Sequence, residues 1–217
     1  KSVDHMIKIS EGCQFKLIAL LRGNNTILPR SYTILHQNDH LYFTAKKGDI
    51  PKILDFFGKE KRKVKKIMVA GGTPLGYQSA QMLEDDYNVT LVEGDKSRCK
   101  MLAENLKHTL VINADPSNIN LLREEGLKEM DVYIGVTPNT ETNVLTCLLA
   151  KDLGVHKTIA MVENIEYTHI SQNIGIDTMI NKKLISANNI FRFVRKGKIE
   201  AIASLHGVDA EIIEFLI

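Results

Sequence analysis

The sequence predicts an α/β fold in which a doubly wound parallel sheet is preceded by a small α+β domain. From Ile67 onward, short apolar runs alternate with helical stretches, and repeated units of this kind build a mostly parallel sheet. Runs such as Val132–Val136 are almost continuously apolar, as in strands that are covered on both faces. Residues 1–58 instead contain short, closely spaced strand patterns, which favours a separate small domain.

The first segment is expected to contain three strands and one helix. The strands are predicted at residues 6–9, 15–21 and 41–44. The stretch Arg22–Asn25 is typical of a hairpin turn. A short helix should begin after Asp49, carry Pro51 in its first turn and end at Gly58. The basic run at residues 59–66 predicts a solvated linker into the next strand.

The second segment is expected to contain six strands separated by helices. The strands are predicted at residues 67–70, 88–93, 110–113, 132–136, 158–162 and 178–180. After a first helix that starts near Gly76, further helices are predicted at residues 97–106, from 117 onward, and at 141–153, 167–173 and 185–196. Their apolar faces should bury Met101, Leu102, Leu106, Leu121 and Leu122. Residues 199–205 and 212–217 predict a β-hairpin that is cut off at its end.

Composition places the chain among folded globular proteins and removes several classes of function. The 217 residues are 44% hydrophobic and 25% charged, with a net charge of +2, so no nucleic-acid partner is expected. No apolar run approaches the ~18 residues of a membrane-spanning helix. The three cysteines are far apart and form no C-x-x-C pair, which predicts reduced thiols and no metal site.

A glycine-rich turn follows the first strand of the second segment. Gly71 and Gly76 have the spacing of the outer glycines in a Rossmann-like dinucleotide-binding turn, and Gly72 lies between them. Glu93 ends the next strand, where such folds place the acid that meets a ribose hydroxyl and opposes the 2′-phosphate of NADP. Two alternatives stay open: the glycines only close a strand–helix corner, and Glu93 is a solvated acid at a strand end.

Two residues of this turn depart from the dinucleotide-binding pattern. Thr73 replaces the middle glycine and brings a Cβ into the space of the pyrophosphate, although its hydroxyl could donate to a phosphate. Pro74, which precedes Leu75, has no N–H group to offer. The turn therefore predicts the shape of a nucleotide site more strongly than it predicts the ligand.

Several stretches carry a resemblance to one family. They are residues 67–76, 89–98, 114–116, 122–127, 131–136, 137–143 and 149–154. These stretches resemble the TrkA N-terminal domain, also called RCK, a family of nucleotide-sensing domains that regulate potassium transport. The similarity covers roughly residues 64–197. One departure is Met161, which stands where members of the family often carry an arginine.

The flanking segments resemble pieces of the C-terminal domain of the same family. The marks in residues 1–58 are Leu20–Gly23, Ile27–Arg30 and Asn38–Leu41. The resemblance implies four parts: a partial C-terminal-type domain (1–58), a basic linker (59–66), a Rossmann-type N-terminal domain (67–197) and a truncated start of a second C-terminal-type domain (198–217). This order matches the centre of a longer tandem TrkA protein.

The resemblance also implies a function and partners. It implies a regulatory nucleotide-sensing subunit of a Trk-type potassium uptake system, which lies in the cytoplasm on the inner face of the plasma membrane. Family members form a homo-oligomeric ring beneath a membrane potassium channel subunit of the TrkH/TrkG type. The ring changes shape on binding NAD(H), ATP or ADP, and this change gates potassium flow.

The candidate ligand-binding residues follow the carboxyl ends of four predicted strands, where doubly wound sheets bind ligands. They are Gly71, Gly72, Thr73, Pro74, Leu75, Gly76, Glu93, Arg98, Asn113, Ala114, Asp115, Thr137, Pro138, Asn139 and Glu141. The resemblance implies that Asn113–Asp115 lie near an adenine and that Thr137–Asn139 lie near ribose and phosphates. Asp115 could equally form a simple turn and helix cap, and capping competes with ligand contact at Glu141 and Asn143, which begin the next helix.

No set of catalytic residues is found, so the chain is not expected to be an enzyme. Two alternatives to a sensor remain: an assembly scaffold that has lost its ligand, and, on weaker grounds, a fragment of an NAD-dependent dehydrogenase. The helix at residues 185–196 is a candidate lever between domains. Its Ile190, Phe191 and Val194 should be buried against one of the domains or against a partner chain.

Overall fold

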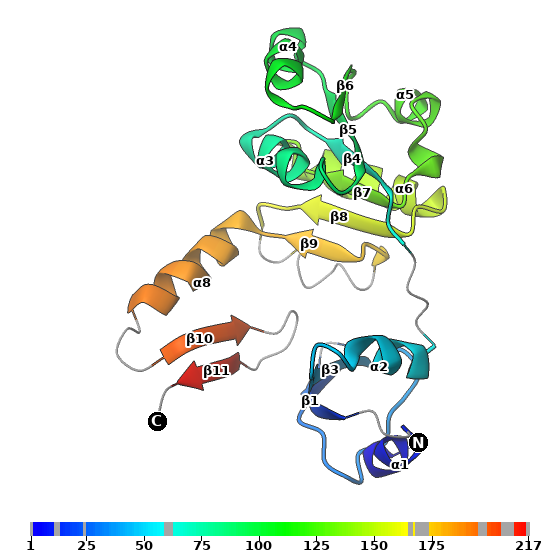
Figure 1. The fold of residues 1–217 in the computed structure, drawn as a ribbon, viewed down its shortest axis with the longest axis vertical. Helices are drawn as coiled ribbons and strands as arrows, with labels where there is room; N and C mark the ends of the chain where they lie inside the picture. Colours follow the sequence, from blue (N-terminus) through cyan, green and yellow to red (C-terminus); the bar gives the residue numbers. More distant parts are fainter. Residues whose placement is uncertain are drawn as a thin grey trace. The chain divides into compact units, whose positions relative to one another are not determined.

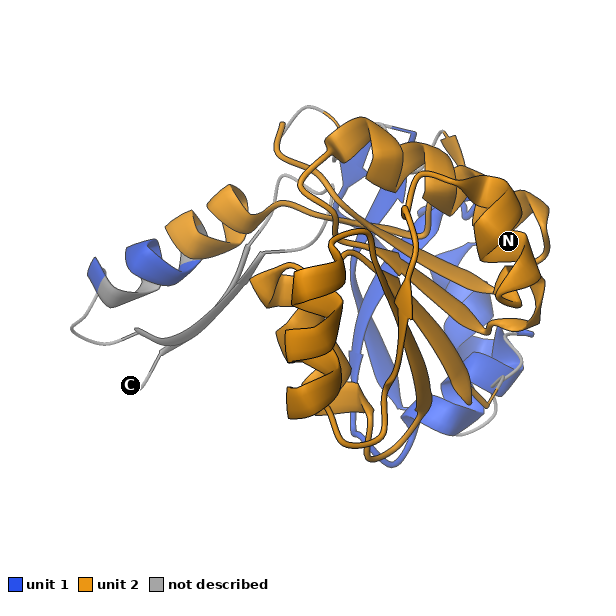
Figure 2. Ribbon diagram, turned by 90° about the horizontal axis from the view of Figure 1, so that it is seen from above, with its two compact units in different colours: residues 1–62, 189–217 blue, residues 63–188 orange. Residues whose placement is uncertain are grey.

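The computed structural model divides the chain into two compact units, each described by itself. One unit comprises residues 63–188, and the other comprises residues 1–62 together with 189–217 (Figure 2). The structure describes residues 2–10, 14–23, 25–58, 63–164, 167, 174–194, 199–204 and 211–215. The first four residues of the predicted linker (59–66), most of the predicted helix at 167–173 and the ends of the predicted hairpin therefore lie outside the described residues.

The larger unit contains a six-stranded sheet in which every strand pair is parallel (Figure 1). Its strands are β4 (Lys66–Ala70), β5 (Asn88–Glu93), β6 (Leu110–Asn113), β7 (Val132–Gly135), β8 (Lys157–Met161) and β9 (Thr178–Ile180). The strand order is β6-β5-β4-β7-β8-β9, which is the doubly wound Rossmann order. The predicted fold class is confirmed.

Helices cover both faces of this sheet, as Figure 1 shows. They are α3 (Pro74–Leu83), α4 (Lys96–Asn105), α5 (Ile119–Glu124) and α6 (Thr140–Asp152), with a 3₁₀ turn at Leu127–Glu129. Successive residues of β4 enter opposite cores: Met68 packs with residues of α5 and α6, whereas Val69 packs with residues of α3 and α4. This alternation explains why the central strands β4 and β7 are almost continuously apolar, since both of their faces are buried.

The helical predictions for this unit need three small corrections. Met101 is 51% exposed, whereas Leu102 and Leu106 are buried as expected. Helix α5 begins at Ile119 rather than Ser117, because the side chain of Asn118 accepts the Leu121 N–H at 3.3 Å and caps the helix there. Leu122 of this helix is fully buried, but Leu121 is only partly covered.

Residues 2–58 form a small α+β arrangement. Strands β1 (Phe15–Arg22), β2 (Asn25–Ile27) and β3 (His40–Ala45) make an antiparallel sheet in the order β2-β1-β3. The hairpin predicted after β1 is present, with Arg22 opposite Asn25. Helix α2 (Ile50–Phe56) follows Asp49 as predicted, although the Asp49 side chain makes no capping bond.

The strand predicted at Met6–Ile9 is wrong, because these residues belong to helix α1 (Val3–Ile9). The Ser2 side chain accepts the His5 N–H and caps the helix, and Asp4 lies in its first turn. Val3 and Met6 are the buried residues of α1, at the i, i+3 spacing of one helix face. The four residues Met6–Ile9 are too few to distinguish the two-residue period of a strand from the 3.6-residue period of a helix.

The last part of the chain contains helix α8 (Lys182–Val194) and the antiparallel hairpin of β10 (Ile199–Ser204) and β11 (Glu211–Phe215), as expected. Ile190, Phe191 and Val194 are 64%, 45% and 75% exposed, so the expected burial against a domain of this chain is not found, and burial against a partner chain stays a prediction. The end of the predicted helix at Lys196 lies outside the described residues.

The ion pair between Arg22 and Asp39 should make the stability of the small sheet sensitive to acid. Both Asp39 oxygens accept from the Arg22 guanidinium at 2.8 Å, and Asp39 Oδ2 also accepts the His36 N–H. The Arg22 hydrogen bonds outweigh desolvation and lower the pKa of Asp39 to about 2. A lowered folded-state pKa stabilises the protein above the unfolded-state value of about 3.9, and this stabilisation is lost as the pH falls through about 2.

We therefore expect the stability of the β1–β3 sheet to be constant near neutral pH and to fall between about pH 4 and pH 2. Backbone NMR signals of residues 15–22, followed through an acid titration of the whole chain, measure this loss. In Arg22→Gln the fall should be shallower because the Asp39 pKa returns toward its ordinary value. An identical acid profile in the two proteins would contradict this account.

Candidate functional site

The carboxyl ends of β4, β5, β6 and β7 meet at one edge of the parallel sheet. Strand β4 lies between β5 and β7. The strand order reverses at this point, because the chain continues from β4 to β5 on one edge of β4 and returns with β7 on its other edge. In doubly wound sheets, a crevice forms where the order reverses in this way. A cavity of about 350 Å³ lies at this edge. It is lined by Gly71, Glu93, Gly94, Arg98, Asp115, Pro116, Ser117, Thr137, Pro138, Asn139 and Thr142.

A second cavity of about 680 Å³ lies at the starts of α3 and α4. It is lined by Gly72, Thr73, Pro74, Tyr77, Arg98, Met101, Asn105 and Pro138. Arg98 and Pro138 line both cavities, so the two spaces adjoin. The lining of the smaller cavity includes the acids Glu93 and Asp115 as well as Arg98. In the larger cavity, Arg98 is the charged lining residue.

Two positions of the β4–α3 turn require glycine, because other backbone atoms lie where a Cβ would be. Gly71 has a φ of +111°, and a Cβ built there would lie 2.8 Å from the Thr137 backbone nitrogen. A Cβ on Gly76 would overlap the carbonyl oxygen of Gly71. These contacts bring the turn against the end of β7, so the glycines close the strand–helix corner whether or not a ligand binds.

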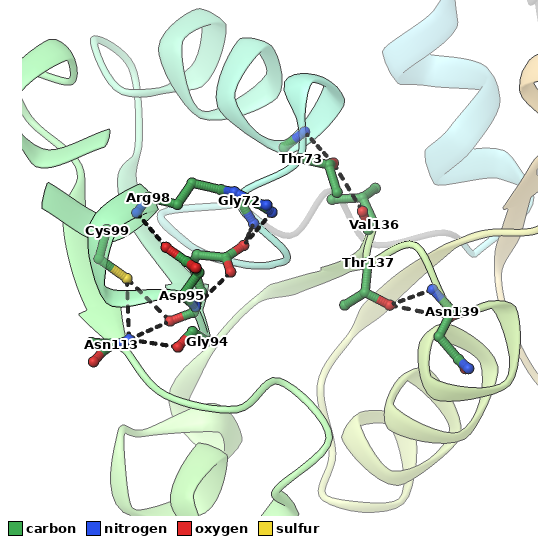
Figure 3. Close-up of polar contacts among 12 residues, drawn as sticks. Gly72, Thr73, Gly94, Asp95, Arg98, Cys99, Asn113, Val136, Thr137 and Asn139 are labelled. Atoms are coloured by element: carbon green, nitrogen blue, oxygen red, sulfur yellow. Dashed lines mark hydrogen bonds and ion pairs between the residues drawn. The ribbon is translucent and has the colours of Figure 1, made fainter. Parts of the chain in front are cut away.

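Thr73 caps helix α3 and ties the turn to β7. Its hydroxyl oxygen accepts the Gly76 N–H at 3.2 Å and donates its proton to the Val136 carbonyl at 3.0 Å (Figure 3). A hydroxyl has a single proton, so this arrangement does not provide the phosphate donor expected from the Thr73 side chain. The backbone N–H groups of Thr73 and Leu75 have no acceptor among the described residues.

Glu93 is buried and bound on both carboxylate oxygens. Its Oε2 accepts the Gly72 N–H at 2.8 Å, its Oε1 accepts the Asp95 N–H at 2.8 Å, and Arg98 approaches Oε2 at 3.5 Å. Glu93 is only 8% exposed, so it is not a solvated acid at a strand end. A carboxylate accepts about four hydrogen bonds, and these three contacts leave room for one more.

The residues after β6 are held mainly by the protein itself. The Asn113 side chain donates to the carbonyl oxygens of Glu93 and Gly94, both at 3.0 Å, and the Ala114 N–H donates to Glu93 (Figure 3 shows Asn113). The backbone N–H and the hydroxyl of Ser117 donate to Asp115 Oδ1 and lower the Asp115 pKa. Asp115 thus forms the predicted turn, but the helix cap is Asn118.

Sequence reasoning placed Asn143 at the start of a helix, where capping competes with ligand contact, and missed its buried role at this edge. Asn143 is fully buried, and its side-chain oxygen accepts from the Thr137 N–H at 2.9 Å and the Thr137 hydroxyl at 2.7 Å. Its amide nitrogen donates to the carbonyl oxygens of Thr137 at 2.9 Å and Met161 at 3.0 Å. Asn143 therefore fixes the cavity residue Thr137 to the end of β8.

The two cavities bring together ten of the fifteen expected site residues. These are Gly71, Gly72, Thr73, Pro74, Glu93, Arg98, Asp115, Thr137, Pro138 and Asn139. The other five residues line neither cavity: Leu75, Gly76, Asn113, Ala114 and Glu141. Glu141 is exposed in the first turn of α6, and the cap of that helix is Asn139, which accepts the Thr142 N–H.

Two further residues near this edge offer it no charged group. Met161 is 3% exposed and packs in the core on the α3–α4 face, so its position offers no cation to the cavities. Burial raises the pKa of the Cys99 thiol, which lies next to Asn113. Within the described ranges, no group of three metal-ligating side chains is found, and no helix has the length and apolar character needed to cross a membrane.

Comparison with known proteins gives consistent matches. The TrkA-N domain family matches residues 67–182. The Trk system potassium uptake protein TrkA homolog 2 of Methanosarcina mazei is 35% identical over 199 residues, which are 91% of this chain and 44% of that protein. The TrkA protein of Haemophilus influenzae is 32% identical over 93% of this chain and 44% of its own length. The chain thus spans about half the length of the curated relatives that it matches.

A solved structure has the same fold at lower identity. The crystal structure of the GsuK RCK domain aligns with a TM-score of 0.61 and 17% identity over 98% of this chain and 53% of that chain.

Proposed function

The chain belongs to the TrkA-N domain family, and from this membership we propose that its larger unit is a nucleotide-sensing module of a potassium uptake system. The observation that carries the proposal is the buried carboxylate of Glu93, which lies directly against the glycine turn through the Gly72 N–H. Curated relatives are named as Trk system potassium uptake proteins.

The edge cavities suit an adenosine nucleotide such as NAD(H), ATP or ADP. Glu93 has capacity for one further hydrogen bond and would accept a ribose hydroxyl, while its charge would oppose the 2′-phosphate of NADP. Arg98 and the N–H groups of Thr73 and Leu75, at the start of α3, would meet phosphate oxygens. Asp115, Pro116 and the turn after β7 would enclose the base and the ribose.

The same premise extends to the architecture and partners of the whole protein. Residues 67–197 would be the Rossmann-type sensor domain, 1–58 part of one C-terminal-type domain, 59–66 a basic linker and 198–217 the start of another. Copies of the protein would form a ring on the cytoplasmic face of the plasma membrane, beneath a TrkH/TrkG-type channel subunit. Nucleotide binding would shift the ring between two conformations because its affinities for them differ. The module would regulate transport and would not catalyse a reaction.

A second candidate, an assembly scaffold without a ligand, is favoured by one observation. Most N–H donors of the glycine turn already bond acceptors within the protein. The Gly71 N–H donates to the Val92 carbonyl, and the Gly72 N–H donates to the Glu93 carboxylate. The Gly76 N–H donates to the Thr73 hydroxyl, and Pro74 has no N–H group. In such a scaffold the carboxylate of Glu93 takes the place that an anionic ligand would otherwise have at the turn. Ligand titration separates the two candidates.

We expect Glu93→Gln to weaken NAD binding about tenfold, because the amide has one acceptor oxygen and no charge for the ribose hydroxyl and turn donors. Isothermal titration calorimetry with NAD, ATP and ADP on the whole chain measures this. Glu104→Gln, the same change at an exposed position of α4, should leave affinity unchanged. If the unaltered protein binds none of the three nucleotides at millimolar concentration, the sensor role is excluded and the scaffold remains.

A further inference from the structure

Two buried asparagines connect the ligand cavity to the start of helix α8. We propose that Asn143 and Asn181 are positioning residues, which couple the turn after β7 to the first turn of α8 through the ends of β8 and β9. Asn143 is fully buried and Asn181 is 3% exposed, so water does not compete for their hydrogen bonds. This inference rests on the proposed function in one respect: it assumes that the smaller cavity binds a nucleotide.

The first link joins the cavity to β8. Thr137 lines the smaller cavity, and its N–H, hydroxyl and carbonyl all bond the Asn143 side chain. The same amide nitrogen donates to the Met161 carbonyl at 3.0 Å. All four hydrogen bonds available to the Asn143 side chain are thereby made, so a shift of Thr137 must move the end of β8 or break a buried bond.

The second link runs from the end of β8 to β9. The Val162 N–H donates to the Ile180 carbonyl at 2.9 Å, which extends the pairing of the two strands. The Glu163 N–H donates to the Thr140 hydroxyl, in the first turn of α6, at 3.2 Å. The segment after β8 is therefore held both by α6, which carries Asn143, and by β9.

The third link reaches α8. The Asn181 side chain donates to the Glu163 carbonyl at 2.9 Å, and its oxygen accepts the Leu184 N–H at 2.9 Å. The Ile185 N–H donates to the backbone carbonyl of Asn181 at 3.1 Å, so Asn181 is the N-cap of α8. One side chain thus both begins the helix and fastens it to the segment after β8.

The arrangement has a consequence for a ligand in the cavity. A nucleotide that contacts the turn after β7 would restrain Thr137, and the restraint would pass through Asn143 and Asn181 to the orientation of α8. Coupling of this kind is reciprocal, so weakening the α8 end must also change affinity at the cavity. The connecting side chains are neutral amides and hydroxyls, so the coupling should not depend on pH near neutrality.

The decisive variant is Asn181→Ser: its hydroxyl can still accept the Leu184 N–H and cap α8, but it is one bond shorter than the amide and does not also reach the Glu163 carbonyl. The matched control is Asn118→Ser, the same change at the N-cap of α5, which lies off this route. Hydrogen exchange of residues 182–190 is measured on the whole chain with and without saturating NAD, and again with ADP. We expect nucleotide to slow this exchange in the unaltered protein and in Asn118→Ser, but not in Asn181→Ser.

Affinity gives the second readout. Calorimetry with the same nucleotides should show about a threefold or larger change for Asn181→Ser and none for Asn118→Ser. If the unaltered protein binds nucleotide without any change in exchange at 182–190, the coupling is refuted while the proposed function stands. The coupling is likewise refuted if Asn181→Ser binds nucleotide and responds like the unaltered protein.

A ligand-free measurement keeps the coupling testable if no nucleotide binds. Thr137→Val removes the hydroxyl that bonds Asn143 at 2.7 Å while keeping the side chain's shape. It should speed exchange at residues 182–190, whereas Thr90→Val, the same change at a buried position of β5 away from this route, should not. Unchanged exchange in Thr137→Val would overturn the coupling independently of any ligand.

Discussion

Gly76→Ala is expected to cost the larger unit about 4 kcal/mol or more of its free energy of unfolding. The new methyl group would overlap the carbonyl oxygen of Gly71, which is backbone and cannot rotate away as a side chain can. The methyl would also lie 3.3 Å from Val136 Cγ2, so the turn cannot move toward β7 to relieve the overlap. The structure must therefore separate α3 from β4.

Denaturant unfolding of the whole chain, followed by circular dichroism, measures this loss. Gly94→Ala is the matched control, since a Cβ there meets its neighbours at 3.8–3.9 Å, which is ordinary contact. We expect that control to unfold within about 0.5 kcal/mol of the unaltered protein. Equal midpoints for Gly76→Ala and Gly94→Ala would show that the turn is looser than described.

Asn143→Ala is expected to destabilise the larger unit by about 3–5 kcal/mol. The substitution leaves the N–H and carbonyl of Thr137 and the carbonyl of Met161 without partners in a buried place, and each such group costs about 1–3 kcal/mol. The effect should be largest at the turn after β7, which lines the smaller cavity.

The same denaturant series measures this second loss. Asn105→Ala is the control, because Asn105 is exposed on α4 and its side chain bonds only the Met101 carbonyl. That change should alter stability by less than about 1 kcal/mol. A stability loss for Asn143→Ala as small as that of the control would mean that water replaces the lost amide.

The parallel sheet could be predicted from sequence because its strands are continuous apolar runs of ordinary length. Leu110–Asn113 has the predicted bounds, and Val132–Gly135 differs from its prediction by one residue. Short segments were harder, since Met6–Ile9 contains too few residues to distinguish a strand from a helix. The signal that identifies α1 is the Ser2 cap followed by the buried pair Val3 and Met6.

The candidate site was only partly accessible to sequence reasoning. The spacing of the glycine turn and Glu93 placed both at the same edge of the sheet, but the hydrogen bond between Gly72 and Glu93 depends on how β4 and β5 are paired. Asn143 left a trace in the sequence: it shares the buried face of α6 with Cys147 and Ala150, at the i, i+4, i+7 spacing. An amide on such an apolar face indicates buried partners, yet the sequence does not say which.

The position of β4 in the sheet has a consequence for synthesis of the protein. β4 pairs with β5 on one edge, but its other edge stays open until β7, which begins at Val132, has been made. A nascent or truncated chain that ends before Val132 would expose a buried, apolar strand as a template for pairing with other chains. Between ribosomal emergence of β4 and of β7, the open edge of β4 is therefore expected to favour aggregation.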